Sequence, residues 1–181
     1  GATLHHGHAQ VMLTQDMHYA KIEALPRAAL SYGQQYGSNY FTDLFQVHQA
    51  LGCGLEKDGV KVLAYLTPIK DKEVLLFGKA LNQSLEERIY EVLACLRDKL
   101  GVTSFNLALT THPLGPVAES WEGFPVLVRI VDRGDPRSQA SDMGTMELYA
   151  SSVIASDPFR VARELKEALL APSPAAEASA A

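Results

Sequence analysis

Two pairs of short apolar runs, one on each side of a long amphipathic segment, constrain the fold of this chain most strongly. Residues 59–69 and 74–81 are rich in Val and Leu, and the polar turn KDKE separates them. Such a pair is typical of two neighbouring strands in an antiparallel sheet. Residues 104–111 and 124–131 form a second pair of predicted strands. With the helical segments described below, this order predicts an α+β domain in which helices pack on an antiparallel sheet.

Residues 84–101 form the clearest predicted helix. Ser84 and Glu87 have the spacing of a capping box, in which the two side chains bond backbone N–H groups at the start of a helix. Gly101 supplies the stop signal. Apolar residues recur at spacings of three and four and predict one buried stripe, made of Ile89, Val92, Leu93, Leu96 and Leu100.

Two helices are expected before the first pair of strands. Residues 21–39 combine a short helical pattern with Pro26 and several glycines, which predicts a helix followed by a loop. A second helical pattern starts at Tyr40, and Gly52 and Gly54 are expected to end it.

One more helix is expected near the C-terminus. Asp157 is placed to be its N-cap and Pro158 its first residue. The expected buried stripe of this helix consists of Phe159, Ala162, Leu165 and Leu169. Residues 146–155 fit a helix or a strand equally well. The small, weakly hydrophobic residues 172–181 predict a disordered tail.

Composition and charge narrow the class of protein. The chain has 181 residues, 47% of them hydrophobic and 20% charged, which suits a globular domain with its own core. The net charge of −5 disfavours an electrostatic nucleic-acid binder. Cys53 and Cys95 form no CxxC pair, so we expect buried thiols rather than a zinc ribbon or a disulfide framework. No apolar run is long enough to span a bilayer, and a cytoplasmic location is expected.

The first 13 residues, GATLHHGHAQVML, hold the candidate chemistry. In an extended chain the period of two places His6, His8 and Gln10 on one face, while Gly7 and Ala9 alternate with them. A purification tag is disfavoured because the run of histidines is interrupted. His6 and His8 could both reach one metal ion, but they supply at most half of a closed zinc site. A neutral imidazole can also attack a phosphorus centre, and the amide of Gln10 can donate to the phosphate oxygens.

This stretch resembles the signature of the galactose-1-phosphate uridylyltransferases and their relatives in the histidine-triad superfamily, in which H-x-H-x-Q leads into an apolar strand. Weaker resemblance extends through residues 101–114, 124–133 and 142–169. The resemblance implies an α+β, histidine-triad-like antiparallel sheet with packed helices.

The resemblance also implies roles for residues at matching positions. His8 matches the nucleophile that becomes nucleotidylated, and Gln10 matches the residue that hydrogen-bonds the phosphate. His6 matches the first histidine of the motif, which orients the site and in some members binds zinc. Asn106 is a further candidate for substrate binding. Glu147 falls in the closing segment without a specific role.

Members of this family contain two repeats, and the signature strand closes the first. The resemblance therefore implies a motif strand from a first repeat at residues 1–20, a connecting helix and loop at 21–39, and a second repeat at 40–171. The strand expected at residues 124–131 contains no histidine, so the second repeat has no triad. We expect the C-terminal part of a longer enzyme.

The expected function is that of a fragment of a nucleotidyltransferase. It would move a nucleoside monophosphate group between a nucleotide sugar and a sugar 1-phosphate through a phosphohistidine. The alternatives are a phosphorylase of ADP-sugars or dinucleoside polyphosphates and a non-catalytic binding or dimerisation domain. The expected partners are a nucleotide or nucleotide sugar and, through exposed strand edges, a second copy of the chain. Zinc is an expected cofactor of the intact protein, and no nucleic acid or membrane is expected to bind.

Other polar and aromatic residues have plainer expected roles. His48 lies in a helical pattern and is expected to be a satisfied surface or boundary residue. His112 precedes Pro113 in a loop after a strand, where ligands often bind, so a structural and a substrate-binding role both stay open. The Lys70–Lys72 turn is expected to be solvated. The expected core aromatics are Tyr40, Phe41, Phe45 and Trp121.

Overall fold

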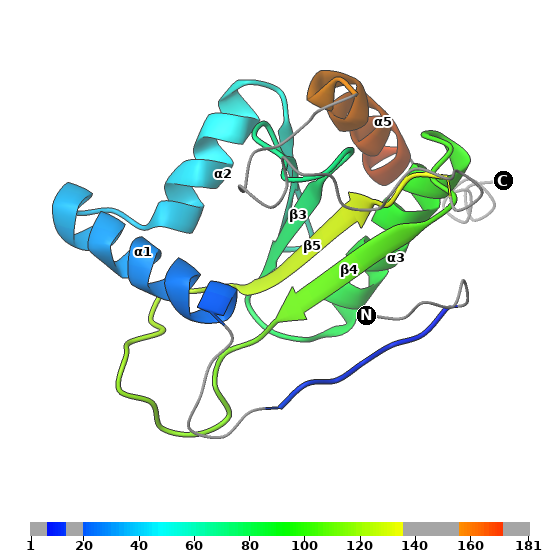
Figure 1. The fold of residues 1–181 in the computed structure, drawn as a ribbon. Helices are drawn as coiled ribbons and strands as arrows, with labels where there is room; N and C mark the ends of the chain where they lie inside the picture. Colours follow the sequence, from blue (N-terminus) through cyan, green and yellow to red (C-terminus); the bar gives the residue numbers. More distant parts are fainter. Residues whose placement is uncertain (1–6, 14–19, 136–155, 172–181) are drawn as a thin grey trace, which may run out of the picture.

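The computed structural model describes residues 7–13, 20–135 and 156–171, and these form an α+β fold (Figure 1). The predicted fold class is therefore confirmed. The expected segment 146–155 and the expected tail 172–181 lie outside the described residues. The elements are α1 (Ala20–Tyr36), α2 (Tyr40–Ala50), β1 (Gly54–Lys57), β2 (Val60–Ala64), β3 (Val74–Gly78), α3 (Gln83–Asp98), β4 (Phe105–Thr110), β5 (Val126–Asp132) and α5 (Pro158–Leu170).

The five strands form one antiparallel sheet in the order β1-β2-β3-β5-β4. The four predicted strands are all present, and β5 lies between β3 and β4. β1 was not predicted from the sequence; it is short and follows α2 almost directly. Asp58 and Gly59 join β1 to β2 in a two-residue turn, and both have positive φ angles, 51° and 76°. This Asp-Gly pair is a strong hairpin signal that could have revealed β1.

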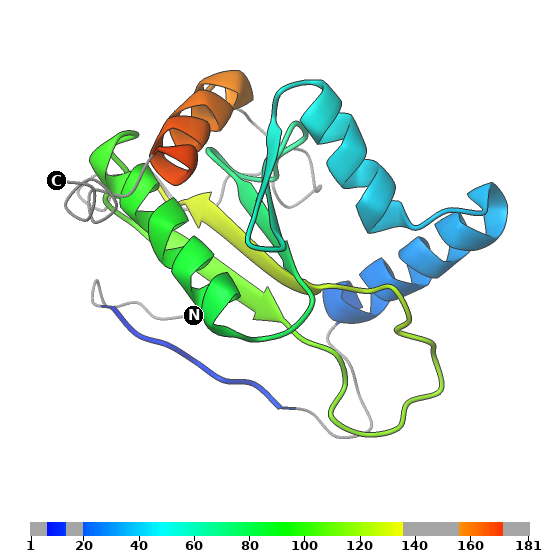
Figure 2. The same ribbon diagram turned by 180° about the vertical axis from the view of Figure 1, so that it is seen from behind.

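Helices cover both faces of the sheet. α3 and α5 lie over one face (Figure 2), where they pack on residues such as Val62, Leu76, Val128 and Ile130. α2 and part of α1 cover the other face. The core on that side includes Phe41, Phe45, Leu63, Leu75, Phe77, Phe124 and Leu127. Tyr40 and Trp121 pack against this second cluster, so the expectation that these aromatic residues belong to the core is confirmed.

The structure corrects the predicted start of α3 and the predicted buried stripe of α5. The N-cap of α3 is Asn82, whose side chain accepts a hydrogen bond from Leu85 N at 3.1 Å. Ser84 therefore lies inside the helix and forms no capping box. In α5, Asp157 caps the helix as predicted. Phe159 is 52% exposed, however, and Val161 occupies the buried stripe in its place.

The first two helices largely match their predictions. α1 is longer than expected and continues through Pro26 to Tyr36. α2 starts at Tyr40, where the side chain of Asn39 caps it. Gly52 follows its end with a φ of +77°, whereas Gly54 begins β1 instead of ending the helix.

The Lys70–Lys72 turn is not a solvated hairpin tip. Lys72 Nζ lies 2.6 Å from Asp132 Oδ2 and 3.3 Å from Asp71 Oδ2. Asp71 in turn accepts hydrogen bonds from the backbone N and the hydroxyl of Ser156, just before α5. Burial opposes charge on both side chains, but these partners outweigh it, lowering the pKa of Asp71 and raising the pKa of Lys72. The turn therefore ties the start of α5 to the sheet.

In the described part of the chain, none of the helices combines the length and hydropathy that crossing a membrane requires.

Candidate functional site

His8 and Gln10 lie on an extended, solvent-exposed segment. Residues 7–13 are all exposed and pass along the β4 side of the sheet (Figures 1 and 2). Residues 7–13 do not form the strand expected here, and they pair with none of the five strands of the described sheet. A strand needs a neighbour for its backbone N–H and C=O groups. His6 and Glu147 lie outside the described residues.

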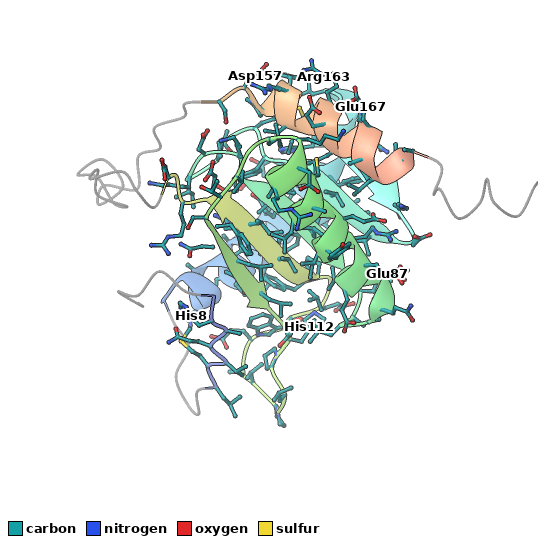
Figure 3. The ribbon with its side chains drawn as sticks, turned by 90° about the vertical axis from the view of Figure 1, so that its right-hand side faces the viewer. His8, Glu87, His112, Asp157, Arg163 and Glu167 are labelled. Atoms are coloured by element: carbon teal, nitrogen blue, oxygen red, sulfur yellow. The ribbon has the colours of Figure 1, made fainter. Side chains whose placement is uncertain are left out.

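The small residues on either side of His8 leave this segment accessible. Gly7 has no atom within 4 Å of the position a side chain would take, and Ala9 is exposed. His8 lies at the end of the molecule opposite to α5, as Figure 3 shows. A ligand can therefore approach His8 from solvent.

His112 lies at the same end of the molecule, on the loop that follows β4 (Figure 3). Its Nε2 bonds the backbone carbonyl of Phe124, and the carbonyl can only accept, so Nε2 carries the proton. In the neutral ring, Nδ1 is then an acceptor. The rings of Trp121 and Phe124 each lie 6.4 Å from the imidazole in edge-on arrangements. The side chain is thus oriented by the loop, although it is exposed.

The loop that holds His112 is anchored to the helices at several points. Trp121 and Phe124 are in edge-on contact at 4.9 Å, and Phe124 contacts Phe41 of α2 at the same centroid distance. Asn39 Nδ2 donates to Gly123 O at 3.0 Å. An ion pair of 2.7 Å joins Arg27 of α1 to Glu119, a loop residue. The cavity between this loop and the helices measures about 30 Å³, room for a water molecule but not for a nucleobase.

Asn106 lies on β4, opposite Val131 of β5, and is exposed. The structure therefore places the described candidate residues His8, Asn106 and His112 on three separate segments. All three can be reached from solvent.

His48 is not a surface residue but is buried, with both ring nitrogens bonded to backbone groups. Nδ1 bonds Leu44 O at 2.8 Å, and Nε2 accepts from Leu66 N at 3.1 Å. Burial lowers the pKa of His48, and the bond to Leu44 only partly opposes this. The expectation of a satisfied histidine is confirmed, but its surface position was wrong, because the α2 face that carries it packs on the sheet.

An ion pair with a buried carboxylate was also not predicted from the sequence. Glu73, just before β3, is fully buried, and its Oε1 lies 3.0 Å from Arg129 NH1 on β5. The guanidinium also lies over the ring of Tyr65, at 6.0 Å. The sequence does contain a signal for this ion pair, because Arg129 is the one charged residue in the apolar run at 124–131. Because the Glu73 carboxylate that it pairs with is buried, Arg129 is anchored to the scaffold.

The described residues do not assemble a metal centre. Across residues 7–13, 20–135 and 156–171, no three His, Cys, Asp or Glu side chains are placed to share an ion. Cys53 and Cys95 are buried and unpaired, as expected. The zinc expectation therefore depends on His6, outside the described residues.

Comparisons with known proteins agree with this architecture. No family model and no curated protein matches the sequence. Among solved structures, one described as a uridylyltransferase matches with a TM-score of 0.66 and 15% identity. A mutant uridylyltransferase matches with a TM-score of 0.65 and 16% identity. The fold is similar to that of solved uridylyltransferases.

An ADP-glucose phosphorylase from Arabidopsis thaliana, solved with bound ADP-glucose, also matches, with a TM-score of 0.59 and 15% identity. Each comparison covers 83% of this chain. It covers 51%, 53% and 49% of the three solved chains in the order given, so this chain spans about half of their length. The predicted likeness in fold to this group of proteins is confirmed.

Proposed function

We propose that this chain carries the nucleophilic segment of a nucleotidyl-transferring enzyme. One combination of observations supports this proposal. The sequence has the spacing H-x-H-x-Q at His6, His8 and Gln10, and the last two of these lie on an accessible segment of a chain whose fold is similar to that of uridylyltransferases.

In the proposed reaction, a ring nitrogen of His8 attacks the α-phosphorus of a nucleoside diphosphate sugar. A nitrogen–phosphorus bond forms, and the bond from that phosphorus to the bridging oxygen breaks. The sugar 1-phosphate leaves with the electron pair of that bond. A phosphate oxygen of a second acceptor then attacks the same phosphorus, and His8 leaves as a neutral imidazole. Such a covalent intermediate gives ping-pong kinetics.

The neighbouring residues have supporting roles in this proposal. The side-chain amide of Gln10, two residues from His8, donates to a phosphate oxygen and stabilises charge that develops in the transition state. His6 orients the site. Asn106 and the accepting Nδ1 of His112 supply contacts to the substrate from the β4 side of the sheet.

A phosphorylase is the second candidate, because one matching structure is an ADP-glucose phosphorylase with bound ADP-glucose. In that reaction the second acceptor is inorganic phosphate, and the product is a nucleoside diphosphate. Both candidates share the first half-reaction at His8 and differ only in the acceptor.

Isotope exchange tests the shared half-reaction. The chain is incubated with UDP-glucose or ADP-glucose and labelled glucose 1-phosphate, without a second acceptor. We expect label to appear in the nucleotide sugar, because the first step is reversible. Inorganic phosphate added afterwards separates the candidates, since only the phosphorylase then forms a nucleoside diphosphate.

Three variants make this assay specific. His8→Ala is expected to abolish exchange, and Gln10→Ala is expected to slow it by about 10²-fold, the typical loss for one donor to a developing charge. His5→Ala is the matched control, because His5 falls outside the alternating set, and it is expected to retain exchange. Exchange that survives in His8→Ala would contradict the nucleophile. A folded chain without exchange would favour a non-catalytic binding domain.

A further inference from the structure

The part of the sheet that α2 leaves uncovered carries polar residues. The aromatic residues of α2 belong to a cluster on one face of the sheet, with Leu63, Leu75, Phe77 and Leu127. Arg129 on β5 is directly opposite Leu75 on β3, so it lies on this same face, as does Asn106 on β4. In Figure 1, α1 and α2 lie to one side of β4, and none of the helices drawn there passes in front of its centre. A ligand can therefore approach this part of the face from solvent.

A buried carboxylate holds Arg129 in place. The side chain of Glu73 has no exposed surface, and its Oε1 lies 3.0 Å from Arg129 Nη1. The other oxygen, Oε2, accepts a hydrogen bond from the backbone N–H of Ile69 at 2.5 Å. The guanidinium also lies over the ring of Tyr65, at 6.0 Å from its centroid. The position of the guanidinium is thus fixed before any ligand binds.

The ion pair presents only its cationic member to solvent. The side chain of Arg129 is 30% exposed, whereas that of Glu73 is fully buried. A guanidinium has five N–H donors, and among the described residues Arg129 forms an ion pair with Glu73 alone. One of the two Glu73 oxygens already bonds Ile69 N, so this carboxylate cannot use all five donors. Arg129 therefore keeps donors for an acceptor on the open face of the sheet.

Stability alone does not account for this ion pair. Removing two charged groups from water costs free energy that their mutual attraction only partly returns, and apolar residues of similar volume often stabilise a fold equally well. Leu75, directly opposite Arg129, is such an apolar and buried residue. An arginine held by its surroundings is instead suited to recognise the oxygens of a phosphate or a carboxylate, which match its planar fork of donors.

β4 supplies a further donor and the space for a ligand. Ala108 is directly opposite Arg129, and its methyl group leaves room above the sheet. Asn106 is two residues from Ala108, so it is a diagonal neighbour of Arg129, and it is exposed. Diagonal neighbours in an antiparallel pair are within reach of long side chains. The guanidinium and the Asn106 amide can therefore donate to one ligand that lies over Ala108.

We propose that Arg129 and Asn106 form a binding site for a phosphate group on the open face of β4 and β5. The guanidinium donates to two phosphate oxygens, and the amide of Asn106 donates to a third. A carboxylate has only two oxygens and would leave one of these donors without an acceptor of its own. The site goes beyond the proposed reaction, because it needs neither His8 nor Gln10.

Equilibrium dialysis with radiolabelled inorganic phosphate measures this binding. Arg129→Lys keeps a positive charge beside Glu73, which protects the fold, but it loses the planar fork that bonds two oxygens. Asn106→Asp keeps the shape of an exposed side chain and places a negative charge beside the ligand. Each change is expected to raise the dissociation constant at least about tenfold, the loss typical of one hydrogen bond to a charged group.

Gln49→Glu is the matched control for Asn106→Asp. Gln49 is exposed at the end of α2, and its backbone lies against Gly54 of β1, at the other edge of the sheet. The variant introduces the same charge away from the site, so it is expected to bind phosphate like the unmodified chain. Circular dichroism and thermal melting establish that each variant is folded.

Amide chemical shifts locate the bound phosphate. When the isotope-labelled chain is titrated with phosphate, the largest changes are expected at residues 106–108 and 129–131. His8→Ala is expected to bind phosphate as the unmodified chain does, which separates this site from the proposed reaction. Competition identifies the source of the phosphate group. Glucose 1-phosphate that displaces the label at a lower concentration than inorganic phosphate indicates a monoester, and the reverse order indicates free phosphate.

Several results would overturn the proposal. They are a folded chain that binds no phosphate up to millimolar concentrations, binding that Arg129→Lys and Asn106→Asp leave unchanged, and shift changes confined to residues 7–13. Acetate that competes better than phosphate would also overturn it. Isotope exchange at His8 is measured separately, so exchange without phosphate binding would overturn this site alone and leave the proposed function intact.

Discussion

His48 joins α2 to the segment after β2 through its own ring: its Nε2 accepts a hydrogen bond from the backbone N–H of Leu66 at 3.1 Å. Nδ1 bonds Leu44 O, which can only accept, so Nδ1 carries the proton and the ring is neutral. The ring also stacks on Tyr65, with centroids 5.6 Å apart and planes inclined by 11°. Protonation of Nε2 would replace an acceptor with a donor that faces the Leu66 N–H.

The stability of the fold should therefore depend on pH through His48. Burial lowers the pKa of His48 in the folded chain, whereas in the unfolded chain it titrates near its ordinary value of about 6.5. The unfolded state then binds more protons between these two pKa values. The contribution of His48 to the free energy of unfolding is therefore fully present above pH ~6.5, and it is lost as the pH falls from there towards the pKa of His48 in the folded chain. Urea unfolding at about pH 5 and about pH 7.5 measures this loss.

Two variants identify His48 as the source of this pH dependence. His48→Gln cannot be protonated, so its loss of stability over this interval is expected to be smaller. His8→Ala removes an exposed histidine and is expected to keep the pH dependence of the unmodified chain. If His48→Gln and the unmodified chain lose equal stability between about pH 7.5 and about pH 5, a group other than His48 causes the pH dependence.

Gly123→Ala should destabilise the fold at the loop that orients His112. Gly123 has a φ of +73°, and an added Cβ would collide with the Asn39 side chain that bonds its carbonyl. We expect a cost of about 1–3 kcal/mol in the free energy of unfolding, measured by urea titration. Gly115→Ala, in the same loop, is the matched control, because its added Cβ meets no atom within 4 Å. It should change the stability by no more than about 1 kcal/mol. Equal effects of the two variants would argue against the strained geometry at Gly123.

Asn82→Ala should destabilise α3, because it removes the side chain that accepts from Leu85 N. The typical cost of losing an N-cap is about 1 kcal/mol. Ser84→Ala, which would remove the cap expected from the sequence, should change the free energy of unfolding by less than about 0.5 kcal/mol. If Ser84→Ala instead destabilises the chain more than Asn82→Ala does, Ser84 caps the helix, as the capping-box spacing predicted.

The two cysteines should be unreactive in the folded chain. Burial raises the pKa of Cys53 and raises the pKa of Cys95 to about 11, so little thiolate forms near neutral pH. Reaction with a chromogenic disulfide reagent is expected to be slow in buffer and fast in guanidinium chloride. Tyr90→Cys, at an exposed residue on α3, provides an exposed thiol for comparison and should add one rapid equivalent. Rapid reaction of a native thiol in buffer would show that the core opens readily.

Much of the fold could be predicted because its local signals agree with its packing. The alternation of apolar runs predicted β2, β3, β4 and β5, and the stripe through Val92 and Leu96 predicted the buried face of α3. Asp157 and Pro158 predicted the start of α5 because they act on their immediate neighbours. The fold class follows from these elements alone.

Features that depend on distant contacts could not be predicted in the same way. The local sequence predicts Lys72 to be a solvated turn residue, but in the folded chain it forms an ion pair with Asp132, sixty positions later. The helical pattern predicts His48 to be a surface or boundary residue, but in the folded chain the segment after β2 covers it, and Leu66 N donates a hydrogen bond to its Nε2. In the candidate site, the spacing of His8 and Gln10 predicted the chemistry, whereas the position of His8 relative to Asn106 and His112 depends on where residues 7–13 lie with respect to β4 and the loop that follows it.

Intact-mass spectrometry tests the proposed phosphohistidine most directly. The chain is incubated with UDP-glucose or, separately, with ADP-glucose, and its mass is measured before and after acid treatment. We predict one nucleoside monophosphate adduct on the unmodified chain and on His5→Ala. The adduct should be lost in acid and absent from His8→Ala. A folded chain without an adduct, or an adduct that persists in His8→Ala, would contradict the account.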